Sequence, residues 1–189
     1  MPARKIASTG PIYQLKVTLQ ETRPPIWRRL QVDAHTTLPQ LHDILQVAMG
    51  WTDSHLHRFF VGGVDYGQPE PGFEEDMRSE QRIKLLQLVT REKAWLGYEY
   101  DFGDGWQHKI VLEKILPPDP AVHYPCCIAG KRACPPEDVG GAWGHANFVD
   151  AMRNETHPEH NDLLEWYGGA FDPEAFSLDE VNQALARFK

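Results

Sequence analysis

The chain has 189 residues, of which 41% are hydrophobic and 11% aromatic; this suits one domain of ordinary size and excludes a disordered chain. No apolar run approaches the ~20 residues that span a bilayer, and the first ten residues lack the apolar stretch of a secretory signal. The net charge is −8, with 19 Lys and Arg against 27 Asp and Glu, which does not favour binding to nucleic acid.

Two strands are predicted near the start of the chain, after a flexible segment of residues 1–10. Residues 13–19 alternate apolar and polar side chains, which is the period of a half-buried strand. Residues 26–32 show a second such pattern. The short connection between them favours a β-hairpin.

A helix is predicted over residues 38–49. Thr37 and Gln40 fit a capping box, in which a hydroxyl and an amide satisfy free backbone N–H groups. Apolar residues then recur at helical spacing and form one face. Gly50 fits the left-handed position that ends such a helix.

The middle of the chain mixes strand patterns with turn-forming residues. Residues 55–61 resemble a third strand. Residues 64–80 are rich in proline, glycine and acidic side chains, which predicts a mobile excursion. Residues 83–89 form a short apolar run, for which we expect a short helix or turn.

A second hairpin is predicted from residues 98–102 and 106–115, which alternate again on either side of an Asp-Gly pair at 104–105. Asp-Gly between alternating runs is typical of a two-residue hairpin loop. That register would place Asp101 opposite His108 on one face of the sheet, where their side chains would touch.

These elements predict an α+β fold, more narrowly a β-grasp-like mixed sheet with a helix packed on one face. Residues 11–116 would form this core, and residues 117–189 a loop-rich and helical C-terminal extension. Ser177 and Glu180 fit a second capping box before an apolar stripe that needs a partner surface. We therefore expect the extension to dock on the core.

Imidazole, carboxylate and indole side chains supply the candidate ligand-binding site. Its members are Trp51, His55, His57, Asp101, Asp104, Trp106 and His108. A carboxylate beside an imidazole raises the imidazole pKa and fixes its tautomer, which suits a general base or a metal site. His55, His57, Asp101 and His108 would form a metal site if their strands are adjacent; the alternative is packed or exposed histidines and a structural hairpin. His42, on the predicted helix, is interpreted as a rim histidine.

Three cysteines, an odd number, favour a cytoplasmic protein with free thiols. Cys127 and Cys134 with His123 are a further candidate for zinc or another divalent metal, although their spacing departs from that of usual zinc sites. No other cofactor is predicted. The chain lacks the Walker A, dinucleotide-binding, G-x-S-x-G and H-E-x-x-H patterns.

The charges are distributed unevenly along the chain. Residues 1–35 hold six basic and two acidic side chains, and residues 135–180 hold one basic and eleven acidic ones. Arg23, Arg28 and Arg29 would form either a solvated sheet face or a patch that binds DNA.

Several motifs together resemble the plasmid pRiA4b ORF-3-like family from Ri plasmids, over nearly the whole chain from Tyr13 to Leu185. They are Pro24–Leu30, Leu41-His42, Met49-Gly50-Trp51, His55-Leu56-His57, Tyr98–His108, Cys134–Gly141, Trp166, Gly168-Gly169 and Phe171–Glu174. The chain departs from the family pattern at Val139, where relatives tend to have a cysteine. Residues 135–138 are interpreted as the start of a helix or turn.

The resemblance implies a bacterial protein, plasmid-borne or chromosomal, from a family in which some members are labelled insertion-sequence passengers of a resolvase type. It implies no biochemical activity. We expect a cytoplasmic, non-catalytic binding or interaction module associated with mobile genetic elements, with an unidentified protein or small molecule as partner and no membrane. The alternative is a metal-dependent hydrolase or nuclease-like enzyme that uses the His/Asp cluster.

Overall fold

The computed structural model describes residues 10–68 and 77–188. The described strands are β1 (Ile12–Leu19), β2 (Trp27–Asp33), β3 (His57–Val61), β4 (Val64–Gly67), β5 (Arg78–Ser79), β6 (Trp95–Tyr100), β7 (Trp106–Leu116) and β8 (Cys126–Lys131). The helices are α1 (Leu38–Met49), α2 (Leu85–Leu88), α3 (Gly141–Arg153), α4 (His160–Tyr167) and α5 (Leu178–Leu185).

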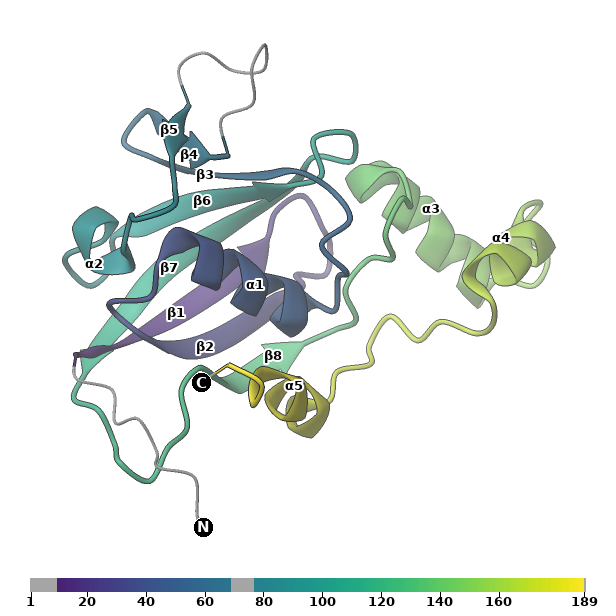
Figure 1. The fold of residues 1–189 in the computed structure, drawn as a ribbon. Coiled ribbons are helices and arrows are strands. Elements are labelled where there is room, and N and C mark those ends of the chain that lie inside the picture. Colours follow the sequence, from purple (N-terminus) through teal and green to yellow (C-terminus); the bar gives the residue numbers. More distant parts are fainter. Residues whose placement is uncertain (1–9, 69–76, 189) are drawn as a thin grey trace.

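One sheet holds all of these strands, in the order β5-β4-β3-β6-β7-β1-β2-β8 (Figure 1). Neighbouring strands are antiparallel except β4 and β5, so the sheet is mixed. With the helices, it makes an α+β fold, as the sequence predicts. The narrower β-grasp-like topology stays a prediction. No helix in residues 10–68 and 77–188 is long and apolar enough to cross a membrane.

The predicted N-terminal hairpin and the helix after it are confirmed. Strand β1 pairs with β2 in antiparallel register, and α1 lies across one face of the sheet (Figure 1). Thr37 and Gln40 form the capping box, and Gly50 ends the helix at φ 95°. Alternate residues of β1 and the apolar face of α1 belong to one buried core. This burial on one side explains the alternation of apolar residues in β1 and their helical spacing in α1.

Two segments expected to be irregular contain strands. Strands β4 and β5 lie within residues 64–80, where we expected a mobile excursion. Residues 69–76 of this excursion and residues 1–9 of the expected flexible start lie outside the described residues. Strand β8 lies in the turn-rich segment after residue 116 and pairs with β2. The prediction of a mobile excursion is therefore wrong for the residues of β4 and β5. Pairing with a neighbouring strand stabilises short segments that show no alternation of apolar and polar residues.

The second predicted hairpin exists, but its register is wrong. Tyr100 pairs with Trp106 and Tyr98 with His108, so the loop holds five residues rather than two. Asp101 stands at φ 58°, and its Oδ1 accepts a hydrogen bond of 2.9 Å from the Gly103 N–H. Because this carboxylate closes the loop, Asp101 is not a neighbour of His108.

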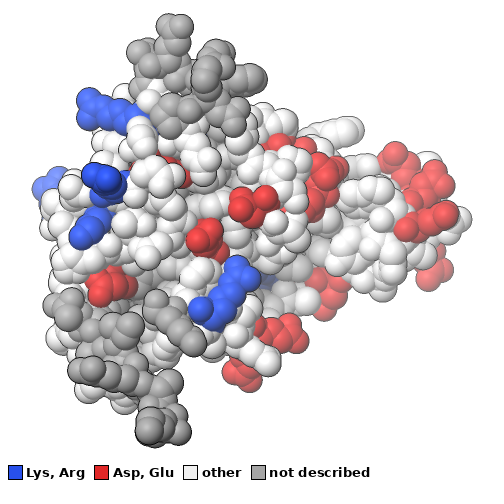
Figure 2. Space-filling model, viewed as in Figure 1, with Lys and Arg blue, Asp and Glu red and all other residues white. Residues whose placement is uncertain are grey.

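Helix α5 contacts β8 and α1. The Asn182 side chain accepts a hydrogen bond from the Cys127 N–H and donates one to the Cys127 carbonyl, each of 2.8 Å. Helices α3 and α4 instead project to one side of the sheet (Figure 1). Acidic side chains gather toward this end of the molecule (Figure 2). The domain boundaries at residues 10 and 116 stay predictions.

The basic residues of the first hairpin do not form a free patch. Arg28 is 3% exposed and donates to main-chain carbonyls, while Arg29 forms an ion pair of 2.6 Å with Glu113. Only Arg23 of the three is exposed. Two of the three arginines that the alternative of a DNA-binding patch requires are therefore engaged within the fold.

Candidate functional site

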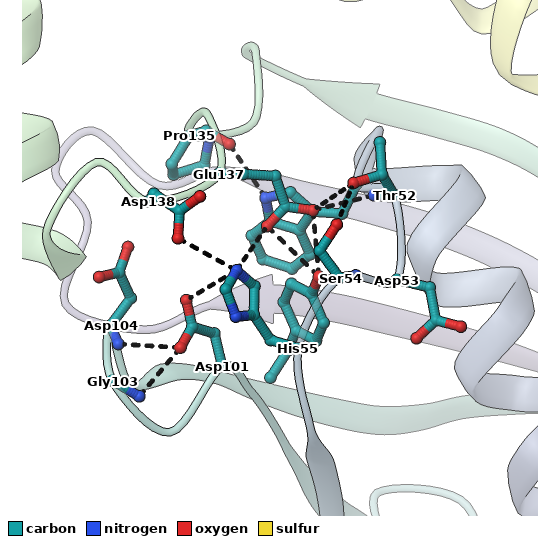
Figure 3. A network of polar contacts seen from close by, with 12 residues as sticks. Thr52, Asp53, Ser54, His55, Asp101, Gly103, Asp104, Pro135, Glu137 and Asp138 are labelled. Carbon is teal, nitrogen blue, oxygen red and sulfur yellow. Dashed lines mark hydrogen bonds and ion pairs between the residues drawn. The ribbon is translucent and has the colours of Figure 1, made fainter.

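Four side chains from three separate segments converge beyond one end of α1, and we call them the acid–imidazole cluster (Figure 3). They are His55 before β3, Asp101 after β6, and Glu137 and Asp138 in the loop before α3. His55 Nε2 lies 3.1 Å from Asp138 Oδ1, 3.6 Å from Asp101 Oδ2 and 4.0 Å from Glu137 Oε2. One imidazole nitrogen therefore faces three carboxylates.

The Asp101 carboxylate is divided between two tasks. Its Oδ1 accepts hydrogen bonds from the backbone N–H groups of Gly103 and Asp104. Its Oδ2 is left to face His55 (Figure 3). The side chain is 9% exposed, so the loop holds this carboxylate in one orientation inside the cluster.

Glu137 is fixed by donors from the loop after α1 and from β6. Its Oε1 accepts hydrogen bonds from the Thr52 N–H at 2.9 Å and the Tyr100 hydroxyl at 3.0 Å. The Tyr100 oxygen in turn accepts from the Ser54 N–H. Burial raises the pKa of Tyr100 well above its ordinary value, with the charge of Glu137 acting in the same direction. Tyr100 therefore stays protonated, and Glu137 Oε2 faces His55.

Two of the predicted ligand-binding residues hold in place the loop before α3, which carries Glu137 and Asp138. The Trp51 indole N–H donates a 3.0 Å hydrogen bond to the Pro135 carbonyl. Asp104 Oδ2 accepts one of 3.1 Å from the Gly140 N–H. Trp51 and Asp104 thus fix the loop that carries Glu137 and Asp138.

Gly141 allows this loop to approach the 101–105 loop. A Cβ added there would lie 2.6 Å from the Asp104 carbonyl oxygen, at φ 69°. Gly105 has the same φ with nothing within 4 Å of an added Cβ.

We expect Gly105→Ala to lower the free energy of unfolding by about 1 kcal/mol, the usual penalty of a left-handed conformation, and Gly141→Ala by about 3 kcal/mol. Urea denaturation measures both, and equal losses would show that the approach of the loops is unimportant.

The cluster has an excess of negative charge. In the described part of the chain, the ion pairs of Asp101, Glu137 and Asp138 all lead to His55, and none leads to a lysine or arginine. Single donor atoms of His55, Asp101 and Asp138 lie within 4.8 Å of one another. This arrangement offers an imidazole nitrogen and carboxylate oxygens to one cation.

A cavity of about 300 Å3 adjoins the cluster, with His55 in its wall. Its polar lining residues are His42, Asp43, Asp53, His55, His57, Gln68 and Glu80. The His42 and His57 rings stack in parallel, with centroids 3.6 Å apart. His57 and His55 therefore lie at one cavity, but His57 is not among the cluster side chains.

His42 is held in one tautomer by a closed ring of hydrogen bonds. The Gln46 amide donates to the Tyr98 hydroxyl, so that hydroxyl donates to His42 Nδ1 at 2.8 Å. His42 Nε2–H then donates to Asp53 Oδ1 at 2.7 Å, and the Asp53 N–H donates back to Gln46. Burial lowers the pKa of His42, and His57 lowers it further. Both ring nitrogens of this neutral histidine are therefore occupied.

His57 pairs with Glu80 on the other side of the stack. His57 Nε2 lies 3.1 Å from Glu80 Oε2. Glu80 has no exposed surface, and its Oε1 lacks a hydrogen-bond partner in residues 10–68 and 77–188. The cavity wall thus contains a buried carboxylate oxygen without a donor.

Trp106 and His108 belong to the core behind the site. Each is 1% exposed, and neither lines the cavity. His108 Nδ1–H donates to the Tyr98 carbonyl at 3.4 Å, and burial lowers the pKa of His108 to about 4. His108 is therefore a neutral core residue at physiological pH and does not join His55 and Asp101.

The cysteine candidates do not assemble either. His123 Nε2 contacts the Phe188 carbonyl at 3.0 Å. Among the described residues, no group of three potential metal ligands includes Cys127 or Cys134. Burial raises the pKa values of both thiols, which keeps them protonated and poor as ligands.

Of the residues proposed from the sequence, His55 and Asp101 face each other directly. The sequence predicts the start of a helix or turn at residues 135–138, and the structure has a turn at Glu137 and Asp138. Glu80 falls in the expected excursion. For Glu137 and Asp138, the only signal in the sequence is the Pro-Pro-Glu-Asp motif. Its neighbours in space lie more than thirty residues away in the sequence, so no local pattern could place it.

Comparison with known proteins shows similarity over almost the whole chain. The sequence profile described as "Plasmid pRiA4b ORF-3-like protein" matches residues 11–180. Uncharacterized protein y4hQ of Sinorhizobium fredii (strain NBRC 101917 / NGR234) is 38% identical over 177 residues, covering 92% of this chain and 90% of that protein. The crystal structure of MM3350, a protein of unknown function from Methanosarcina mazei Go1, is also 38% identical. It superposes with a TM-score of 0.82, over 91% of this chain and 98% of the other.

Proposed function

Since the chain belongs to the plasmid pRiA4b ORF-3-like family, whose compared members carry no stated activity, we propose a function from the geometry: a metal-dependent hydrolytic enzyme. The acid–imidazole cluster would hold one divalent cation next to the cavity. The observation that carries this proposal is His55 Nε2, which has no hydrogen-bond partner among the described residues although three carboxylates surround it.

The spacing of the donor atoms suits a cation. Metal–nitrogen and metal–oxygen bonds of roughly 2.0–2.2 Å place the ligand atoms of one ion roughly 3–4.5 Å apart. The distances of 3.1, 3.6 and 4.0 Å from His55 Nε2 fall in this range. Imidazole with carboxylates suits zinc and manganese, and a cation would offset the excess negative charge.

The neighbouring cavity would hold the substrate on which the ion acts. A bound divalent cation lowers the pKa of a coordinated water and polarises a substrate oxygen. His55 lies in both the cluster and the cavity wall, so the proposal places the substrate in the cavity, next to the ion. His57, paired with the buried Glu80, stands in the same wall as an oriented imidazole suited to accept a proton.

The non-catalytic binding module has less support from the geometry. Its expected ligand surface combined indole, imidazole and carboxylate side chains, and of these Trp51, Trp106 and His108 are only 7%, 1% and 1% exposed. A cytoplasmic location, which the odd number of cysteines favours, and an association with mobile elements, which the resemblance implies, remain part of the proposal.

Metal analysis tests the proposal. Protein purified without an affinity tag is expected to bind close to one equivalent of zinc or manganese by isothermal titration calorimetry and elemental analysis. Asp101→Asn and Asp138→Asn should weaken metal binding about 100-fold. Both variants should fold, since the amide oxygen of the asparagine introduced in the first can still accept the loop hydrogen bonds and the Asp138 side chain is 70% exposed.

Glu155→Gln, in the exposed turn between α3 and α4, is the matched control and should bind metal as the wild type does. Less than about a tenth of an equivalent of bound metal, with no gain after zinc or manganese is added, would refute the proposal. Equal affinities of the wild type and the two aspartate variants would place the metal elsewhere.

A further inference from the structure

We propose that the cavity beside the acid–imidazole cluster binds a small organic cation, a primary ammonium or guanidinium with a short apolar body. As the substrate class of the hydrolytic enzyme, this rests on the proposed function; as a binding site, it rests on the cavity alone. Three features of the cavity carry it: the charge of its wall, an unsatisfied buried carboxylate, and its apolar rim.

The wall of the cavity is acidic. Asp43, Asp53 and Glu80 line it, and no lysine or arginine does so among the described residues. His42 does not offset this charge, because burial and the adjacent His57 lower its pKa and keep its ring neutral. The wall therefore favours a cationic ligand over an anionic one.

Glu80 supplies a specific contact, which the ligand reaches by displacing the side chains that now cover this carboxylate. It has no exposed surface, its Oε2 is engaged by His57, and its Oε1 has no hydrogen-bond partner in the described part of the chain. A buried carboxylate oxygen without a donor is unfavourable. An ammonium or guanidinium N–H group is the donor that this oxygen lacks, and a charged donor forms the stronger hydrogen bond.

A second metal ion does not fit this wall as well as an organic cation. His42, Asp43 and Asp53 could hold an ion by spacing alone. His42 Nε2–H, however, already donates to Asp53 at 2.7 Å, and His42 Nδ1 is engaged by Tyr98. A metal ion would have to break this ring of hydrogen bonds, whereas a ligand that donates N–H groups leaves it intact.

Apolar side chains complete the lining. Phe102 and Leu56 are 39% and 46% exposed, and Pro39 and Met77 also face the cavity. The Phe102 ring already has the Arg58 guanidinium 5.7 Å from its centroid, so its remaining exposed surface serves to pack against alkyl groups. The lining therefore suits a ligand with a cationic head and a short hydrocarbon chain.

Isothermal titration calorimetry at low salt tests the inference, with metal-free protein and matched four-carbon probes. Butylguanidinium and butylammonium are expected to bind at least about tenfold more tightly than the neutral butyramide. Glu80→Gln should weaken butylguanidinium binding at least tenfold, and Asp43→Asn, on the exposed side of α1, several-fold. Glu155→Gln, which removes the same charge far along the chain, should have no effect.

The outcomes are separable. Equal binding of butyramide and butylguanidinium, or cation binding unchanged in both cavity variants, would overturn the inference. If Glu80→Gln fails to fold, as its urea transition would show, Asp43→Asn decides. Asp138→Asn should lose metal binding and keep butylguanidinium binding. Cation binding without any metal binding would refute the proposed enzyme and leave the cation site, and the reverse result would refute only the cation site.

Discussion

At pH 4.5 the protein is expected to have lost roughly 2–3 kcal/mol of its free energy of unfolding relative to pH 7.5 through His108 alone. Burial lowers the pKa of His108 from 6.5 to about 4 in the folded chain. Between these values the unfolded chain takes up a proton at this residue and the folded chain does not, so stability falls as the pH falls. The contribution is complete above about pH 6.5 and largely lost near pH 4.

Urea denaturation at pH 7.5, 6.5, 5.5 and 4.5 measures this effect when the wild type is compared with His108→Gln. Glutamine keeps an N–H donor for the Tyr98 carbonyl and does not titrate. Between pH 7.5 and pH 4.5, the free energy of unfolding of His108→Gln should therefore fall by roughly 2–3 kcal/mol less than that of the wild type. Burial also lowers the pKa of His42, and lowers that of His145 to about 4, so both residues keep a dependence of the same sign in both proteins.

Ile110→Val is the control, because Ile110 is fully buried on the same strand and carries no titrating group. It should lower stability by about 1 kcal/mol at every pH and leave the wild-type dependence unchanged. Parallel curves for the wild type and His108→Gln would show that His108 does not resist protonation in the fold.

Local signals explain what the sequence predicted about the fold. The capping box at Thr37 and Gln40 and the alternation of β1 each involve residues a few positions apart, and both were confirmed. The two-residue loop at 104–105 was also a local prediction, but it failed. The Asp101 side chain competes for the loop N–H groups and moves the register. A side chain that bonds its own backbone can override a turn preference.

The site was predictable only where its residues share a segment with a recognisable pattern. His55 and Asp101 flank strands and were proposed from the sequence. Glu137 was not, because Thr52 and Tyr100 hold it across a long sequence separation. Glu80 lies beside β5, a two-residue strand that its pairing with β4 defines. Its role in the cavity follows from that pairing and not from its neighbours in the chain.

Arg28→Met is expected to lower the free energy of unfolding by roughly 4 kcal/mol, measured by urea denaturation at neutral pH. The Arg28 guanidinium donates to the carbonyls of Ala48 at the end of α1, of Trp27 within β2, and of Lys131 and Arg132 at the end of β8. It also stacks over the Phe176 ring at 4.5 Å. Methionine fills the space of the stem but leaves the buried Ala48 carbonyl and three partly buried carbonyls without these donors, and the loss of a buried donor costs about 1–3 kcal/mol before relaxation.

Arg28→Lys keeps the charge and should recover only about half of the loss, because a single ammonium cannot reach carbonyls on both sides of the planar guanidinium. Arg23→Met is the control: Arg23 is exposed in the same hairpin, and its loss should change stability by less than about 0.5 kcal/mol. A loss below about 1 kcal/mol in Arg28→Met would contradict the structural role of Arg28 and return it to the candidates for a surface patch. The expected large loss would instead assign Arg28 to joining α1 and β8, the elements that α5 contacts.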